Sequence, residues 1–141
     1  MLKKFYKIVI LPFTVFLLYL MFFGMGRTQY EDHVIRVEPL FATLGFIENT
    51  VSWFEIIKIV VGNVVMFIPF GFLGWVFPRL ENLRENILFF ISAIVIVEAL
   101  QYFTRLGIFE VDDVILNTFG VFLGWRIKRM LEVKFSRFII K

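Results

Sequence analysis

The apolar positions of the chain fall into four long runs that short polar stretches separate. The runs cover residues 8–26, 56–77, 87–103 and 111–127. Their lengths are close to the roughly 20 residues with which an α-helix crosses the hydrocarbon core of a bilayer. The pattern therefore predicts an all-α membrane protein with four transmembrane helices, formed by a single domain of residues 1–141.

The first run follows a basic start that contains Lys3, Lys4 and Lys7. A secretory signal peptide begins in the same way, but its apolar core is shorter and a small-residue cleavage site follows it. Residues 8–26 are longer than such a core and no such site comes after them. We interpret them as a transmembrane helix.

The longest polar stretch, residues 27–55, separates the first two runs. Its second half carries apolar residues at helical spacing: Leu40, Leu44, Ile47, Val51 and Phe54. This spacing predicts a helix that lies in the membrane interface, with Trp53 at the level of the headgroups. A loop with a chance periodicity is the alternative.

Composition supports the membrane assignment, and charge adds an orientation. The hydrophobic fraction is 60% and the chain has no Cys, which excludes disulfides and thiol chemistry. Of the 15 Lys and Arg residues, 11 lie in three segments: the N-terminus, the turn between the second and third runs, and residues 126–141, which include the tail of residues 128–141. The positive-inside rule then places both termini and a basic tail in the cytoplasm.

Several polar side chains interrupt the apolar runs. They are Asn63 in the second, Glu98, Gln101 and Arg105 in and after the third, and Asp112, Asp113 and Asn117 in the fourth. A charge at the centre of a membrane helix costs about 2.5–3.5 kcal/mol on insertion scales, so such residues tend to be functional. Helical spacing puts Glu98, Gln101 and Arg105 on one face. The sequence therefore predicts a polar site in the outer half of the bilayer.

Structural roles would also account for parts of this set. Asp112 or Asp113 could cap the fourth helix, Glu98 and Arg105 could form an ion pair, and the two Asn side chains could join helices. These alternatives remain open at this point. However, one Arg cannot neutralise three carboxylates, so we expect a net negative pocket.

The same residues carry a resemblance to a known family. The segment NVVMFIPFGFLGW (63–75) and the segment EALQYFTRLGIFEVDDVILNTFGVFLG (98–124) resemble the two conserved blocks of the VanZ-like membrane proteins. That family is named for low-level resistance to the glycopeptide teicoplanin. The resemblance implies a bacterial cell-envelope protein, and it supplies no mechanism.

Three functions fit these observations. The first is a non-enzymatic protein that binds a lipid headgroup or a lipid-linked cell-wall precursor, and we rank it highest. The second is an intramembrane enzyme that uses Glu98, Asp112 and Asp113 as acid–base groups or as Mg²⁺ ligands. The third is a small transporter or proton relay. We expect no cofactor, no resident metal and no nucleic-acid partner, and an oligomer is left open.

Overall fold

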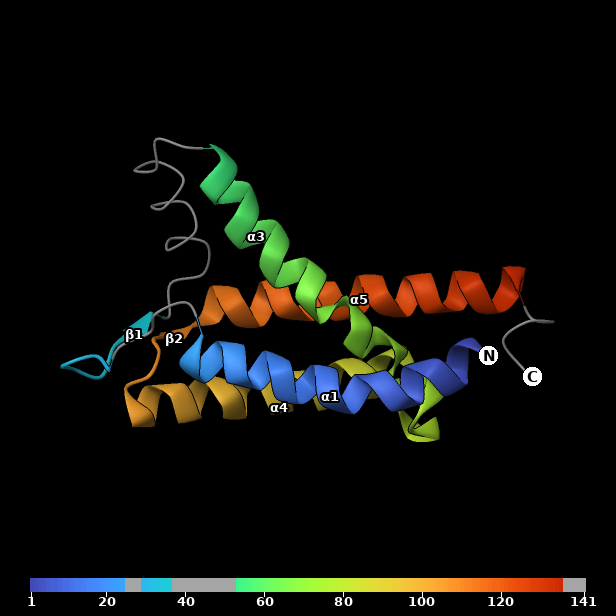
Figure 1. Cartoon of the computed structure of the whole chain (residues 1–141), viewed down its shortest axis with the longest axis horizontal. Helices are drawn as coiled ribbons and strands as arrows, with labels where there is room; N and C mark the ends of the chain where they lie inside the picture. Colours follow the sequence, from blue (N-terminus) through green and yellow to red (C-terminus); the bar gives the residue numbers. More distant parts are fainter. Residues whose placement is uncertain (25–28, 37–52, 136–141) are drawn as a thin grey trace.

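The structure, a computed structural model, describes residues 1–24, 29–36 and 53–135, and its elements are mainly helical (Figure 1). The interfacial helix expected in the first polar stretch falls largely on residues 37–52, outside the described residues. The elements are α1 (Leu2–Phe23), β1 (Ile35–Arg36), α3 (Trp53–Phe67), η1 (Ile68–Trp75), η2 (Pro78–Glu81), α4 (Leu83–Thr104), β2 (Phe109–Glu110) and α5 (Val111–Lys134).

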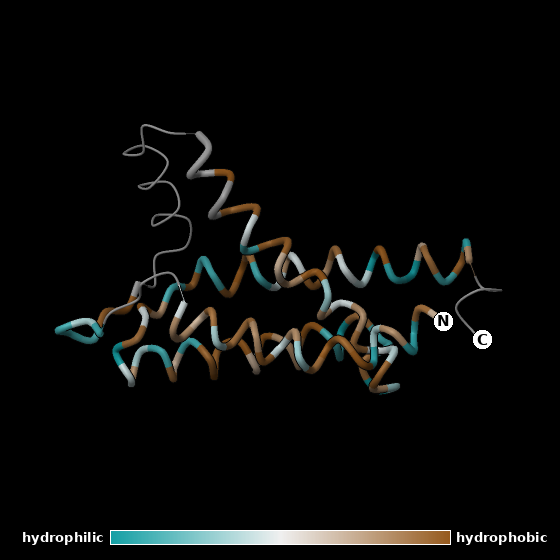
Figure 2. The backbone as a smooth tube through the Cα atoms, in the orientation of Figure 1, coloured by the Kyte–Doolittle hydropathy of each residue, from teal (hydrophilic) through white to brown (hydrophobic). Residues whose placement is uncertain are grey.

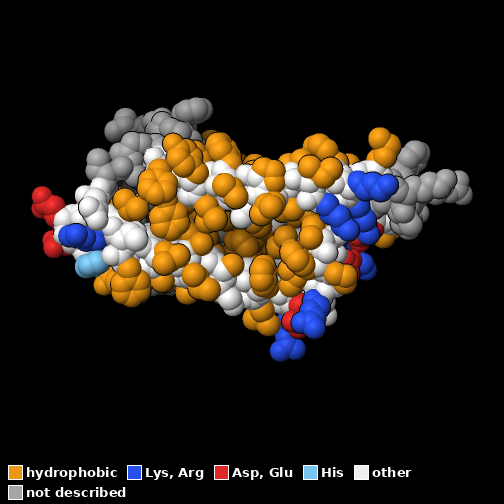
Figure 3. All heavy atoms as spheres, turned by 60° about the horizontal axis from the view of Figure 1, so that its bottom comes forward, with side chains coloured by type: hydrophobic (Ala, Val, Ile, Leu, Met, Phe, Trp, Pro, Cys, Tyr) orange, Lys and Arg blue, Asp and Glu red, His pale blue; other side chains and the backbone are white. Residues whose placement is uncertain are grey.

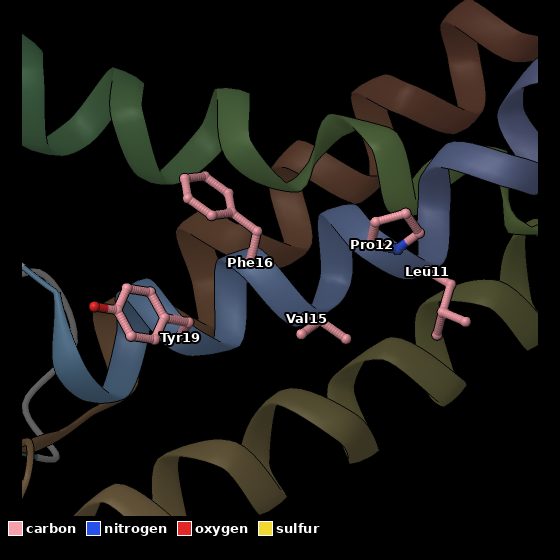
Figure 4. A pocket seen from close by; sticks show the side chains of 5 residues that line it. All are labelled: Leu11, Pro12, Val15, Phe16 and Tyr19. Atoms are coloured by element: carbon pink, nitrogen blue, oxygen red, sulfur yellow. The ribbon is translucent and has the colours of Figure 1, made fainter.

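Two of the four predicted spans, α1 and α4, are long and apolar enough to cross a membrane by length and composition. Large apolar side chains remain exposed along both helices. On α1, Leu11, Val15, Phe16 and Tyr19 project from the helix around a shallow hollow (Figure 4). In water such a surface would be unfavourable, whereas lipid tails would cover it without cost.

The second span is not one continuous α-helix. The α-helix α3 ends at Phe67, and the chain continues as the 3₁₀ helix η1 with Pro69 in its first turn. Pro lacks an N–H group and its ring clashes with the preceding turn, so an α-helix cannot pass through it undisturbed. As a result α3 lies at an angle to α1, α4 and α5, which follow the long axis of the molecule (Figure 1).

The helix at the fourth predicted span is longer than that span, because α5 continues to Lys134. Residues 128–134, which the sequence assigned to the basic tail, are therefore helical. Helix α5 packs extensively against η1 and α3. Gly120 and Gly124 allow this close approach, since a Cβ atom at either position would meet the carbonyl oxygen of Val64 or Ile68. Helix α5 therefore packs through a face of small residues.

The main apolar core lies where these helices meet. It consists of Leu17 from α1, Phe67 at the end of α3, Phe90 and Ile94 from α4, and Val121 from α5. The ring of Phe67 packs edge-on against that of Phe90, with their centroids 5.5 Å apart. Because this core fixes α4 against α5, it also fixes the polar residues that follow it on α4 and precede it on α5.

A short parallel pairing joins the first loop to the turn before α5. Ile35 pairs with Phe109 and Arg36 with Glu110, a feature that the sequence pattern did not predict. Two-residue strands carry no usable periodicity, because the alternation of a strand needs at least four residues to be recognised.

The two ends of the molecule differ in character. Met1 and the last turn of α5 lie at one end, which we call the termini side, and β1 and β2 lie at the other, the loop side (Figure 1). Hydrophilic residues gather at both ends and along part of α5 (Figure 2). Basic side chains cluster at the termini side, while the face between the two ends is apolar (Figure 3).

Candidate functional site

The predicted polar residues come together at the loop side, where α4 ends and α5 begins. Glu98 is buried, with 1% of its surface exposed, on the last two turns of α4. Its Oε2 atom accepts a hydrogen bond of 3.5 Å from the backbone N–H of Glu110, directly before α5. Glu98 therefore joins the end of α4 to the start of α5.

Asn63 and Asp113 form the second link of this site. The Nδ2 group of Asn63 on α3 donates to Oδ1 of Asp113 on α5 over 2.9 Å. The two residues are 50 positions apart in the chain, so the bond is purely tertiary. Interhelical hydrogen bonds of this kind contribute about 0.6 kcal/mol on average within membranes.

Gln101 links α4 to α1. Its Nε2 group donates to the backbone oxygen of Met21 over 2.7 Å. Met21 lies in the last turn of α1, where carbonyl groups have no partner within the helix. The buried side chain of Gln101 on α4 thus donates a hydrogen bond to a backbone carbonyl group at the end of α1.

Arg105 does not lie on the helical face that the sequence predicted for it. Helix α4 ends at Thr104, and Arg105 has a φ of 59°, in the left-handed region. This conformation commonly terminates helices, and it takes Arg105 out of the i+7 relation to Glu98. Its guanidinium group donates to the backbone oxygen of Glu31 over 3.1 Å, so it holds the first loop against this turn.

Asp112, Asp113 and Asn117 occupy the first two turns of α5. Glu110 is the N-cap residue, so neither Asp112 nor Asp113 is, although both lie in the first turn, where the helix dipole favours negative charge. Asp112 and Asn117 are buried, with 4% and 2% of their surface exposed. The Oδ1 atom of Asn117 is buried and has no hydrogen-bond partner among the described residues.

The site thus contains a set of links between neighbouring elements and one buried acceptor, Oδ1 of Asn117. Within residues 1–24, 29–36 and 53–135, no three acidic or His side chains come close enough to hold a metal ion. We call the seven predicted residues the loop-side site: Asn63, Glu98, Gln101, Arg105, Asp112, Asp113 and Asn117.

A second polar cluster, at the termini side, was not predicted. Lys128 is completely buried on α5, and its Nζ atom lies 2.8 Å from Oε2 of Glu81 on η2. Nζ makes no aligned hydrogen bond, so the contact is an ion pair. Gly74 makes room for it, since a Cβ atom there would lie 2.6 Å from Oε2 of Glu81 and 2.8 Å from Nζ.

Two Trp side chains complete this termini-side cluster. The indole N–H of Trp125 donates to the backbone oxygen of Glu81 over 3.0 Å, and that of Trp75 donates to Glu132 over 2.6 Å. The sequence held one signal for the cluster. Gly120, Gly124 and Lys128 follow each other at four-residue spacing, which places Lys128 on the buried glycine face of α5.

Comparison with known proteins places the chain in a family. The VanZ/LLP1 family profile matches residues 8–132. Protein VanZ of Enterococcus faecium is 29% identical over 117 residues, which cover 79% of this chain and 66% of that protein. The chain thus spans slightly less than two thirds of the length of this relative, and no solved structure matches it. Because the profile extends over most of the chain and includes every residue of the loop-side site, the protein belongs to the VanZ/LLP1 family.

Proposed function

We propose that this protein is an integral membrane protein of the cell envelope that binds the headgroup of a membrane lipid or of a lipid-linked cell-wall precursor at its loop-side site. In this proposal both termini are cytoplasmic, so the site opens toward the outer leaflet. By altering access to that headgroup, the protein confers low-level tolerance to teicoplanin, the phenotype for which the family is named.

The observation that carries the proposal is the unpartnered oxygen of Asn117. A buried acceptor that lacks a donor costs about 1–3 kcal/mol, and folding gains nothing from it. The site also buries Glu98, Gln101 and Asp112. A ligand with hydroxyl, amide or ammonium donors would supply what Oδ1 of Asn117 lacks. Sugars, peptides and amine headgroups all carry such donors.

An apolar cavity next to the site supports a ligand that has a hydrocarbon chain. It measures about 300 Å³ and is lined by α1, α4 and the α3–η1 junction, including Leu17, Met21, Phe90 and Val97. Met21 is also the residue whose backbone oxygen accepts from Gln101. The cavity is thus linked to the loop-side site through Met21, although no residue of that site is in its lining. In our proposal one molecule places its headgroup at the site and its chain between α1 and α4. The apolar face is hollowed near its middle (Figure 3).

The test replaces Asn117 by Leu, with Thr118→Val as the matched control. Both substitutions remove a buried oxygen that has no hydrogen-bond partner in the described part of the chain. The two positions lie in the same turn of α5. Replacing such an atom by an apolar group is neutral or stabilising. Both variants should therefore reach normal membrane levels, as measured by immunoblot. Asn117→Leu alone should lose the tolerance of a sensitised host to teicoplanin and the lipid that co-purifies with the protein.

The outcomes separate the parts of the proposal. If Asn117→Leu keeps both tolerance and bound lipid at normal levels, the loop-side site is not the binding site. If Thr118→Val loses both as well, the effect is a general one on α5 and the assignment fails. A chain that confers no tolerance before any substitution would remove the resistance role and leave lipid binding to be judged by mass spectrometry of the purified protein.

A further inference from the structure

We propose a second lipid site at the termini side, for the headgroup of an anionic phospholipid, between η2 and the second half of α5. A cavity of about 460 Å³ opens there, with Arg79, Glu81, Trp125 and Arg129 in its lining. This end is opposite to the loop-side site, so the inference does not depend on the ligand proposed there and shares only the proposed cytoplasmic position of the termini.

A neighbouring cavity extends this site along α5. It measures about 500 Å³, and its lining includes Arg126, Met130, Val133 and Lys134. Trp125 and Arg129 line both cavities, so the two form one surface. We call this surface the basic groove.

The charge of the basic groove is not neutralised within the protein. Its one acidic residue, Glu81, already pairs with Lys128 at 2.8 Å and lies 3.6 Å from Arg129. Arg79 and Arg126 are exposed, and neither forms an ion pair with any described residue. The groove therefore offers two cationic groups that lack a counter-ion, together with Lys134. This charge is complementary to a phosphate diester.

The wall between the two cavities is held in place. Trp125 donates its indole N–H to the backbone of Glu81, and the guanidinium carbon of Arg129 lies 5.8 Å from the centre of the Trp125 ring. Arg129 also lies 3.7 Å from Glu132. A fixed wall lowers the entropy that a ligand must lose on binding. Indole rings are also typical of the level at which lipid headgroups lie.

The apolar part of the groove favours a lipid over a free anion. Met130 and Val133 remain 68% and 83% exposed beside Lys134. A soluble phosphate would leave these side chains in water, whereas the glycerol and first methylene groups of a phospholipid would cover them. Basic pockets beside transmembrane helices on the cytoplasmic side are known to bind anionic headgroups.

The experiment titrates the purified full-length protein, in a neutral detergent, with phosphatidylglycerol and with phosphatidylcholine of the same acyl chains. Thermal unfolding is followed by size-exclusion chromatography. Phosphatidylglycerol should raise the midpoint of unfolding and phosphatidylcholine should not. Because each basic side chain at such a site contributes a factor of about 5 in affinity, Arg79→Gln and Arg126→Gln should each weaken the apparent binding of phosphatidylglycerol roughly 5-fold.

The matched control is Arg84→Gln. Arg84 is exposed at the same end of the molecule but lines neither cavity. The Arg84→Gln variant should bind phosphatidylglycerol with the affinity of the unmodified protein. Arg79 and Arg126 form no ion pair with a described residue, so their variants should fold. If one of the two variants does not fold, the other still tests the proposal.

Three results would overturn the proposal. An equal rise in the midpoint of unfolding with both lipids would show that the protein does not recognise the charge of the headgroup. An equal stabilisation by inorganic phosphate would show that the groove binds a free anion. A loss in Arg84→Gln as large as that in Arg79→Gln and Arg126→Gln would show a diffuse attraction to the whole end and no defined site.

Discussion

The buried ion pair between Lys128 and Glu81 makes an asymmetric prediction for stability. Lys128 has 0% of its side chain exposed, whereas Glu81 has 42% exposed. Replacing Glu81 by Gln removes the partner and leaves an ammonium group buried. Replacing Lys128 by Met removes the buried charge itself and leaves a carboxylate that water and Arg129 can solvate.

The burial of the two side chains sets how much stability each substitution removes. Removing one partner of a fully buried pair costs about 3–5 kcal/mol, and losing an exposed pair costs about 0.2–1 kcal/mol. This pair lies between the two limits because solvent reaches the Glu81 side. We therefore expect Glu81→Gln to destabilise the fold by roughly 2–3 kcal/mol and Lys128→Met by at most about 1 kcal/mol. The double variant should be more stable than Glu81→Gln alone.

The free energy of unfolding can be measured by titration with sodium dodecyl sulfate in mixed micelles. Trp75 and Trp125 both contact the cluster, so their fluorescence reports on it directly. Equal losses in the two single variants, or a double variant that loses the sum of both, would refute the reasoning. The control is Glu85→Gln, an exposed carboxylate in the first turn of α4, which should change stability little.

Two further predictions follow from the packing and the proposed orientation. Gly124→Ala should lower the stability or the membrane level of the protein severely, because the added Cβ atom would meet the carbonyl oxygen of Ile68. A Cβ atom added at Gly62 would have no neighbouring atom within 4 Å, so Gly62→Ala should be neutral. Equal effects of the two substitutions would refute the close packing of α5 on η1. In this Cys-free chain, a Cys placed at Asp32 should react with an impermeant thiol reagent in intact cells and a Cys placed at Glu85 should not, and the opposite pattern would reverse the orientation.

The apolar pattern anticipated where the helices lie, but their ends were less well determined. Helix α1 begins at Leu2, six residues before the start of the predicted span at residue 8. Lys has a helix propensity close to that of Leu, so the basic residues of the N-terminus continue the helix. The departure from α-helix at Pro69 could be foreseen, because it depends on the covalent structure of one residue. The end of α4 before Arg105 could not be foreseen, because a residue in the left-handed conformation at the end of a helix is usually Gly.

The sequence by itself indicated the family and the helical class, because hydropathy and motif spacing are properties of the chain alone, and it predicted the residues of the loop-side site. Only the tertiary structure decided which of these residues meet. It paired Asn63 with Asp113, directed Glu98 to the start of α5, and buried Lys128 against Glu81. Such partners lie far apart in sequence, and a charge in a polar segment looks the same whether water or a neighbouring helix will solvate it. Which one does so depends on how the helices pack, and here the glycine face of α5 brings Lys128 into the interior.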